Sequence, residues 1–230
     1  MATWITHLRI AEKVFEKVDG LAETEFTVGN MAPDSGVPNA DWSVFTPGRD
    51  VSHYFYQGPD GVKNIHIDAF DAKYLNDDVV KTYNIEQLSF YLGYHTHLFS
   101  DICWARAVDF QLREKFGENY ISDKNTCLSK LRYDWYDLDF LYLSDKGIFR
   151  GFEVYLKAEG FENTFLDFFS PDAFDNRRQF ITSHYLAGKE GVCREYDYVT
   201  QDEMDAFVVE TAEKAAKWIL EKTKLPSLKK

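Results

Sequence analysis

The chain has 230 residues, and its 38 acidic side chains outnumber its 26 basic ones, which gives a formal net charge of −12 at pH 7. This excess of negative charge argues against nucleic-acid binding, which needs a basic surface, and against stable association with an anionic membrane. Aromatic side chains make up 17% of the chain, enough for a large core, and no repeat, linker or low-complexity segment divides residues 1–230 into more than one expected domain.

Three cysteines, none of them in a C-x-x-C pair, favour free thiols in a reducing compartment over a thiolate zinc site. The first 17 residues carry charges where a signal peptide would need an apolar run, and no run of 18 apolar residues is present. We therefore expect a cytoplasmic protein without a membrane-spanning segment.

The N-terminal segment predicts an amphipathic helix over residues 3–18. Its apolar side chains fall in one arc of roughly 120°, and His7 lies inside that arc, so it faces the core. A histidine on a core face is most often satisfied by a single hydrogen bond, but it is also a candidate metal ligand. Gly20 ends this helix, and a second short helix is expected over residues 22–30.

A long ordered loop is predicted over residues 31–50, because three prolines and two glycines interrupt it: Pro33, Pro38, Pro47, Gly36 and Gly48. Asp34 lies in this loop, where an aspartate commonly closes an Asx turn or caps a helix. A short aromatic segment over residues 51–56 follows and contains His53. Since long ordered loops are often functional, Asp34 and His53 are candidate ligands as well.

The centre of the chain predicts a buried helix over about residues 84–110, with no proline, one glycine and apolar side chains all round its axis. His97 and Asp101 are one turn apart on the same face, so they can bind one metal ion together. His95 lies roughly 160° round the helix and is expected to be structural. Chance gives roughly 0.6 such His–Asp pairs in a chain of this composition, so the pair needs support from elsewhere.

The remaining segments predict a turn and then a series of helices: a turn at 58–61 and helices over 68–76, 123–143, 149–168 (one or two short ones), 171–187 and 201–222. Because no run of alternating strands is present, the expected class is all-α, a multi-helix bundle around the buried central helix. Asp134, Asp137 and Asp139 are expected to form a solvated acidic edge or to line the mouth of a site. His184 lies near a helix end, an ordinary place for a histidine.

Five residues along the chain offer nitrogen or oxygen ligands of the kind that zinc accepts: His7, Asp34, His53, His97 and Asp101. The absence of sulfur among them indicates a hydrolytic type of site. The chain also carries the patterns G-N-x-A-P-D at residues 29–34 and G-Y-x-x-H-x-x-x-D at residues 93–101. In the order of these ligands and in both patterns, the first 105 residues or so resemble the bacterial zinc-dependent phospholipase C family, which is itself similar to the S1/P1-type nucleases.

The resemblance implies an all-α protein that holds zinc ions between its helices. It implies that Asp34, His53, His97 and Asp101 bind one ion, and that Asp101 bridges to a second ion bound by His7. The expected cofactor is therefore one or two Zn²⁺ ions, with Mn²⁺ or iron as alternatives.

The chain departs from the family pattern at two places. The family completes the second ion with the amino group of an N-terminal tryptophan, whereas this chain begins with Met1 and has Trp4 instead. A third ion would need two later histidines and a glutamate, but no histidine lies between His97 and His184. We therefore expect the third ion to be absent.

These features predict a metal-dependent hydrolase of a small phosphoester or phosphodiester, with a metal-activated water and with Asp34 and Asp101 as catalytic carboxylates, Asp34 also being a candidate general base. The acidic composition favours a small substrate over a membrane lipid. The alternative is a catalytically silent helical domain that uses the metal as a structural staple or binds a ligand or partner in its cleft. An HD-type phosphohydrolase is ranked lower, because none of the six histidines is followed by aspartate.

Overall fold

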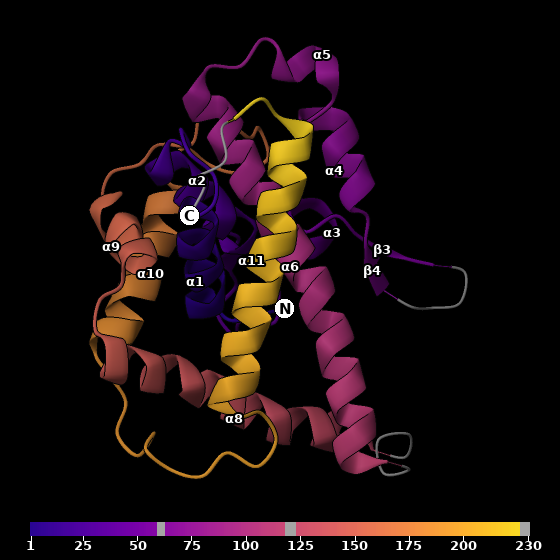
Figure 1. The fold of residues 1–230 in the computed structure, drawn as a ribbon, viewed down its shortest axis with the longest axis vertical. Coiled ribbons are helices and arrows are strands. Elements are labelled where there is room, and N and C mark those ends of the chain that lie inside the picture. The colour runs from indigo at the N-terminus through magenta and orange to yellow at the C-terminus, as the bar shows by residue number, and fades with distance from the viewer. Residues whose placement is uncertain (59–62, 118–122, 226–230) are drawn as a thin grey trace.

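The computed structural model describes residues 1–58, 63–117 and 123–225. Helices dominate these residues (Figure 1), and the sheets among them have only two strands each, so the predicted all-α class is confirmed. The helices are α1 (Trp4–Phe15), α2 (Glu23–Met31), the 3₁₀ turn η1 (Ala32–Asp34), α3 (Arg49–Ser52), α4 (Ile67–Tyr74), α5 (Asp77–Val80), α6 (Ile85–Phe116), α8 (Lys124–Lys146), α9 (Arg150–Lys157), α10 (Ala173–Leu186) and α11 (Gln201–Lys222).

Two small antiparallel hairpins interrupt the helices. Strand β1 (Val37–Pro38) pairs with β2 (Phe45–Thr46), and β3 (Phe55–Gln57) pairs with β4 (Lys63–Ile65). The first hairpin lies inside the segment predicted as a long loop, because strands of two residues are too short to show an alternating pattern. The turn predicted at 58–61 falls mostly outside the described residues.

Local capping chemistry sets the ends of the long helices. Asn84 and Gln87 form a capping box at the start of α6, and Thr200 and Glu203 form another at the start of α11. The central helix runs to Phe116, six residues beyond the predicted end, and stops before Gly117, which has a φ of 51°. Helix α11 has the predicted bounds, whereas only residues 150–157 of the predicted 149–168 region are helical.

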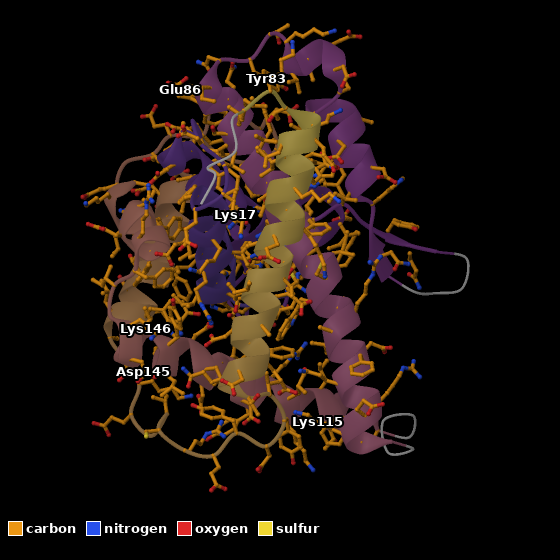
Figure 2. The ribbon with its side chains drawn as sticks, viewed as in Figure 1. Lys17, Tyr83, Glu86, Lys115, Asp145 and Lys146 are labelled. Atoms are coloured by element: carbon orange, nitrogen blue, oxygen red, sulfur yellow. The ribbon has the colours of Figure 1, made fainter. Side chains whose placement is uncertain are left out.

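The long helices stand side by side and α8 lies across one end of them (Figure 1). Lys115 lies on one side of this end and Asp145 and Lys146 lie on the other, so α8 spans its width (Figure 2). The largest hydrophobic cluster fills the space between α1, α2, α6 and α11 and includes Phe26, Phe90, Tyr94, Leu98 and Ile219. No helix in the described ranges combines the length and the apolarity that crossing a membrane requires.

Helices α2 and α6 approach each other closely at two glycines. A Cβ added to Gly29 would lie 2.1 Å from the carbonyl oxygen of Phe90, and one added to Gly93 would lie 2.0 Å from that of Phe26. Any side chain here would therefore collide with the backbone of the facing helix, which cannot move aside without separating the two helices. This contact brings the end of α2, and η1 directly after it, against the middle of α6.

We expect Gly93→Ala to destabilise the protein by about 1–3 kcal/mol or more, because the added methyl group forces α2 and α6 apart. Urea unfolding followed by circular dichroism measures this change. Ser129→Ala, at an exposed position of α8, is the control and should change the unfolding free energy by less than about 0.5 kcal/mol. A Gly93→Ala protein as stable as the wild type would contradict the close helix contact.

Candidate metal centre

All five candidate ligands lie together where four segments of the chain meet. His7 comes from α1, Asp34 ends η1, His53 follows α3, and His97 and Asp101 come from α6. The three imidazoles and the Asp101 side chain are buried, with at most 2% of each residue exposed. Their convergence depends on tertiary packing, since up to 94 positions along the sequence separate them.

The ligand atoms form two groups that share His97. In the first group, His53 Nε2 lies 3.3 Å from His97 Nε2 and 3.3 Å from Asp34 Oδ1. In the second, Asp101 Oδ1 lies 3.5 Å from His7 Nε2, and Asp101 Oδ2 lies 3.6 Å from His97 Nε2. Within each group the ligand atoms are all within 4.8 Å of one another. Two adjacent positions are therefore available to metal ions.

Hydrogen bonds at Nδ1 orient the imidazole rings. His97 donates from Nδ1 to the carbonyl oxygen of Asn30 at 2.7 Å. Ser100 Oγ donates to backbone carbonyls of its own helix, so it accepts the Nδ1 hydrogen of His7 at 3.1 Å. His53 Nδ1 lies 2.9 Å from Ser52 Oγ. With their Nδ1 atoms protonated, His7 and His97 turn Nε2 lone pairs toward the cluster, as metal-binding histidines do.

Two residues without a metal-ligand signature hold the carboxylates. Trp4 Nε1 donates to Asp34 Oδ2 at 2.9 Å, and the backbone N–H of Ala2 donates to Asp101 Oδ1 at 2.8 Å. The resemblance draws attention to Trp4 only as a counterpart of the family's N-terminal tryptophan, and nothing in the sequence singles out Ala2, Asn30 or Ser100. Their roles depend on which group each faces in the folded chain.

The electrostatics keep both carboxylates of the centre ionised at neutral pH. Burial works against ionisation of Asp34 and Asp101, but the neighbouring imidazoles hold the pKa of each carboxyl well below its usual range. Burial, followed by the proximity of His7, lowers the pKa of His97 to about 3. His97 is therefore neutral at pH 7, the form in which a histidine binds metal.

A divalent cation fits these residues. Among the described residues, His7 Nε2 and Asp101 Oδ2 are buried without a hydrogen-bond partner, which is costly unless another group satisfies them. Two ionised carboxylates and neutral imidazole nitrogens form a donor set that zinc accepts, and the positive charge of the ion would offset the buried negative charge.

A cavity of about 760 Å³ opens onto one side of the centre. Asp34 and His53 line it, whereas His7, His97 and Asp101 are not among its lining residues. The group of Asp34, His53 and His97 is therefore reached from the cavity, and the group of His7, His97 and Asp101 lies behind it. His184 also lines the cavity.

His95 lies away from both groups. Its Nδ1 is 2.7 Å from Asp71 Oδ1, and its ring stacks on Trp218 at 3.6 Å between centroids. The structural role expected for His95 agrees with these contacts.

The expected solvated acidic edge on α8 is wrong. Asp134, Asp137 and Asp139 are all buried, with at most 3% exposed. Asp134 and Asp137 pair with Arg194, and Asp137 also pairs with Lys189, both from the segment after α10. These partners lie more than 50 positions away in sequence, so helical spacing gave no sign of them.

Asp139 is enclosed between α8, α10 and the start of α1. It accepts hydrogen bonds from Thr3 Oγ1 at 2.6 Å and from the Tyr185 hydroxyl at 2.6 Å. Burial raises the pKa of Asp139 to about 7, although these hydrogen bonds oppose the shift. Since Thr3 caps α1, this carboxyl connects α8 to the helix that carries His7.

We expect Asp139 to make the metal-free protein less stable as the pH rises from about 4 to 7. Between its usual pKa of 3.8 and its folded pKa of about 7, the native state holds a proton that the unfolded chain releases. The stabilisation that is fully present below pH 4 is therefore lost as the pH rises toward 7. Asp139→Asn mimics the protonated acid and should remove this slope, about 1.4 kcal/mol per pH unit. Urea unfolding of both proteins at several pH values measures it; parallel curves would contradict the raised pKa.

Replacing His97 or Asp101 by alanine is expected to abolish tight metal binding, because each removes a ligand atom from the buried centre. Elemental analysis of the purified proteins, with Kd values from titration of the metal-free forms, measures the loss. His66→Ala, at an exposed histidine outside both groups, should keep the wild-type metal content. Full metal content in folded His97→Ala protein would overturn the assignment.

Comparison with known proteins identifies a family. Residues 6–220 match the model of the family described as zinc dependent phospholipase C. No significant match was found among curated proteins or solved structures. The matched region extends from α1 to α11 and contains all five candidate ligands, well beyond the first 105 residues that carry the sequence patterns. The chain belongs to the zinc-dependent phospholipase C family.

Proposed function

We propose that the protein is a metal-dependent hydrolase of a small phosphodiester, with zinc held by His7, Asp34, His53, His97 and Asp101. Membership of the family supports metal-dependent phosphodiester hydrolysis, and the two groups of ligand atoms support one or two ions. Zinc bound here would lower the pKa of a water molecule and polarise a phosphoryl oxygen.

The observation that carries this proposal is the opening of the cavity onto Asp34 and His53. A catalytic metal site needs an open position for water and substrate, whereas a structural site is closed by protein ligands. The volume of about 760 Å³ is within the range of small-molecule sites. A substrate in this cavity would therefore meet the open group of ligands directly.

The two carboxylates have different surroundings, and we assign them different roles. Asp34 borders the cavity, and its Oδ2 is held by Trp4, which orients Oδ1 toward His53. Because the pKa of Asp34 is held well below its usual range, it is a weak general base at neutral pH, and we favour it as a ligand that positions the ion. Asp101 belongs to the closed group, but its Oδ2 lies 4.0 Å from His53 Nε2 of the open group, so this carboxylate could help to hold an ion in either position.

The alternative function, a metal used as a structural staple, has support in the second group. His7, His97 and Asp101 lie behind the cavity and join α1 to α6. We propose that an ion in this closed group stabilises the fold while the open group carries the chemistry. A protein that binds metal only in the closed group would correspond to the catalytically silent alternative, in which the metal is purely structural.

We expect the metal-loaded protein to hydrolyse bis(4-nitrophenyl) phosphate with Zn²⁺ or Mn²⁺ between pH 6 and 9, and to lose this activity with a chelator and regain it when metal is restored. Asp34→Asn should lower kcat/KM by about a hundredfold or more, because it weakens the open group. Asp50→Asn, an exposed aspartate on α3, is the matched control and should keep wild-type activity.

Release of 4-nitrophenolate measures turnover, and metal content is determined on the same samples. If protein that retains one bound ion shows no turnover with any metal, the result would favour a structural role for the metal. Unchanged activity in Asp34→Asn would show that the chemistry takes place elsewhere.

A further inference from the structure

The cavity has a basic lining in an acidic protein. Arg49, Arg177 and Lys189 line it, and among the described lining residues Asp34 is the only carboxylate. Lys189 is already paired with Asp137, and Arg49 is exposed. The residue that remains to be explained is Arg177.

Arg177 is a buried cation that forms no ion pair in the described part of the chain, although the Asp34 carboxylate, which lines the same cavity, acts on its charge from beyond ion-pairing distance. Three arginines there are less than 9% exposed: Arg9, Arg177 and Arg178. Arg9 pairs with Asp205, and Arg178 Nε lies 2.7 Å from Asp175 Oδ1. The guanidinium of Arg177 instead donates to the carbonyl oxygen of Gly36. A buried charge is costly without an opposite charge, and this one faces a cavity into which an anion can enter.

Aromatic rings surround this guanidinium. Its central carbon lies 5.9, 6.0 and 5.5 Å from the ring centroids of Trp42, Phe45 and Phe180. These are distances at which a cation interacts with an aromatic ring. An arginine therefore already occupies the aromatic wall that would otherwise attract a positively charged ligand, and a second cation would be repelled.

The local backbone holds this wall in place before any ligand arrives. Trp42 has a φ of 61°, an uncommon conformation for a residue other than glycine. Trp42 lies at the tip of a hairpin that two hydrogen bonds close. The N–H of Asn39 donates to the carbonyl oxygen of Val44, and the N–H of Val44 donates to Asn39 Oδ1. The Trp42 ring lies 5.0 Å from that of Phe180 between centroids. Trp42 and Phe180 remain 46% and 41% exposed, so the wall offers apolar surface at the cavity mouth.

We propose that Arg177 recognises a negative charge on the substrate, and that the cavity consequently accepts anionic phosphoesters with an uncharged apolar ester group and rejects those that carry a quaternary ammonium group. This inference rests on the proposed function, because it names the substrate class of that site. Guanidinium groups pair well with phosphoryl oxygens. The apolar ester group would contact Trp42, Phe45 and Phe180, and repulsion from Arg177 supplies the discrimination against a cation.

The test compares two ligands that differ in one charge: phosphocholine and 3,3-dimethylbutyl phosphate, in which a carbon replaces the quaternary nitrogen. Quenching of tryptophan fluorescence gives both Kd values for the zinc-loaded protein, since Trp4 and Trp42 line the cavity. We expect the wild type to bind 3,3-dimethylbutyl phosphate at least tenfold more tightly. In Arg177→Gln this ratio should fall to about threefold or less, and the affinity for 3,3-dimethylbutyl phosphate should fall about tenfold or more, as loss of a charged hydrogen bond predicts.

Arg177→Lys, which keeps the charge, should retain most of the ratio. Arg178→Gln is the matched control, because this neighbouring buried arginine is paired with Asp175 and does not line the cavity; it should keep the wild-type ratio. Equal or tighter binding of phosphocholine by the wild type would overturn the proposal, even if Arg177→Gln does not fold. A folded Arg177→Gln protein that keeps the wild-type ratio of the two Kd values would also overturn it. Because binding needs no turnover, absence of hydrolysis would count against the proposed function alone.

Discussion

The close contact between α2 and α6 determines where the metal centre lies. Gly29 and Gly93 let the backbones of the two helices touch, and no larger residue leaves room for this. The contact places the carbonyl oxygen of Asn30 at the Nδ1 atom of His97, which turns the other nitrogen of that ring toward the ligand cluster. It also carries η1, and with it Asp34, to the same place. A packing constraint between two helices thus sets the orientation of a ligand and the position of another.

The second constraint is that buried negative charge gathers in the metal centre, while a buried positive charge, Arg177, lines the adjoining cavity. The metal centre concentrates carboxylates that stay ionised beside imidazole nitrogens, so it favours a cation. The cavity in front of it presents Arg177, which forms no ion pair among the described residues, so it favours an anion. A phosphoester needs both, since its phosphoryl group must approach a metal while its own negative charge is compensated. The net charge of −12 conceals this local arrangement.

Much of the molecule follows from patterns along the chain. The bounds of α11 and the burial of the middle of α6 follow from periodicity and breaks, because these features depend on neighbouring residues; both ends of α6 are exposed. The five candidate ligands were also named in advance, since their types, order and resemblance to a family narrowed the choice. The expected solvated edge or site mouth at residues 134, 137 and 139 does not form, because an isolated helix cannot show that Arg194, Lys189, Thr3 and Tyr185 will cover its acidic side chains.

The sequence by itself determined the helical class, the central helix and the set of residues able to bind a metal. Those properties depend on residue type and on spacing within a few turns. Only the tertiary structure decided that the ligands form an open and a closed group, that Trp4 and Ala2 hold the carboxylates, and that Arg177 faces the cavity without an ion pair among the described residues. Such features arise where distant segments meet, and burial then sets the protonation state and the ligand preference of each group.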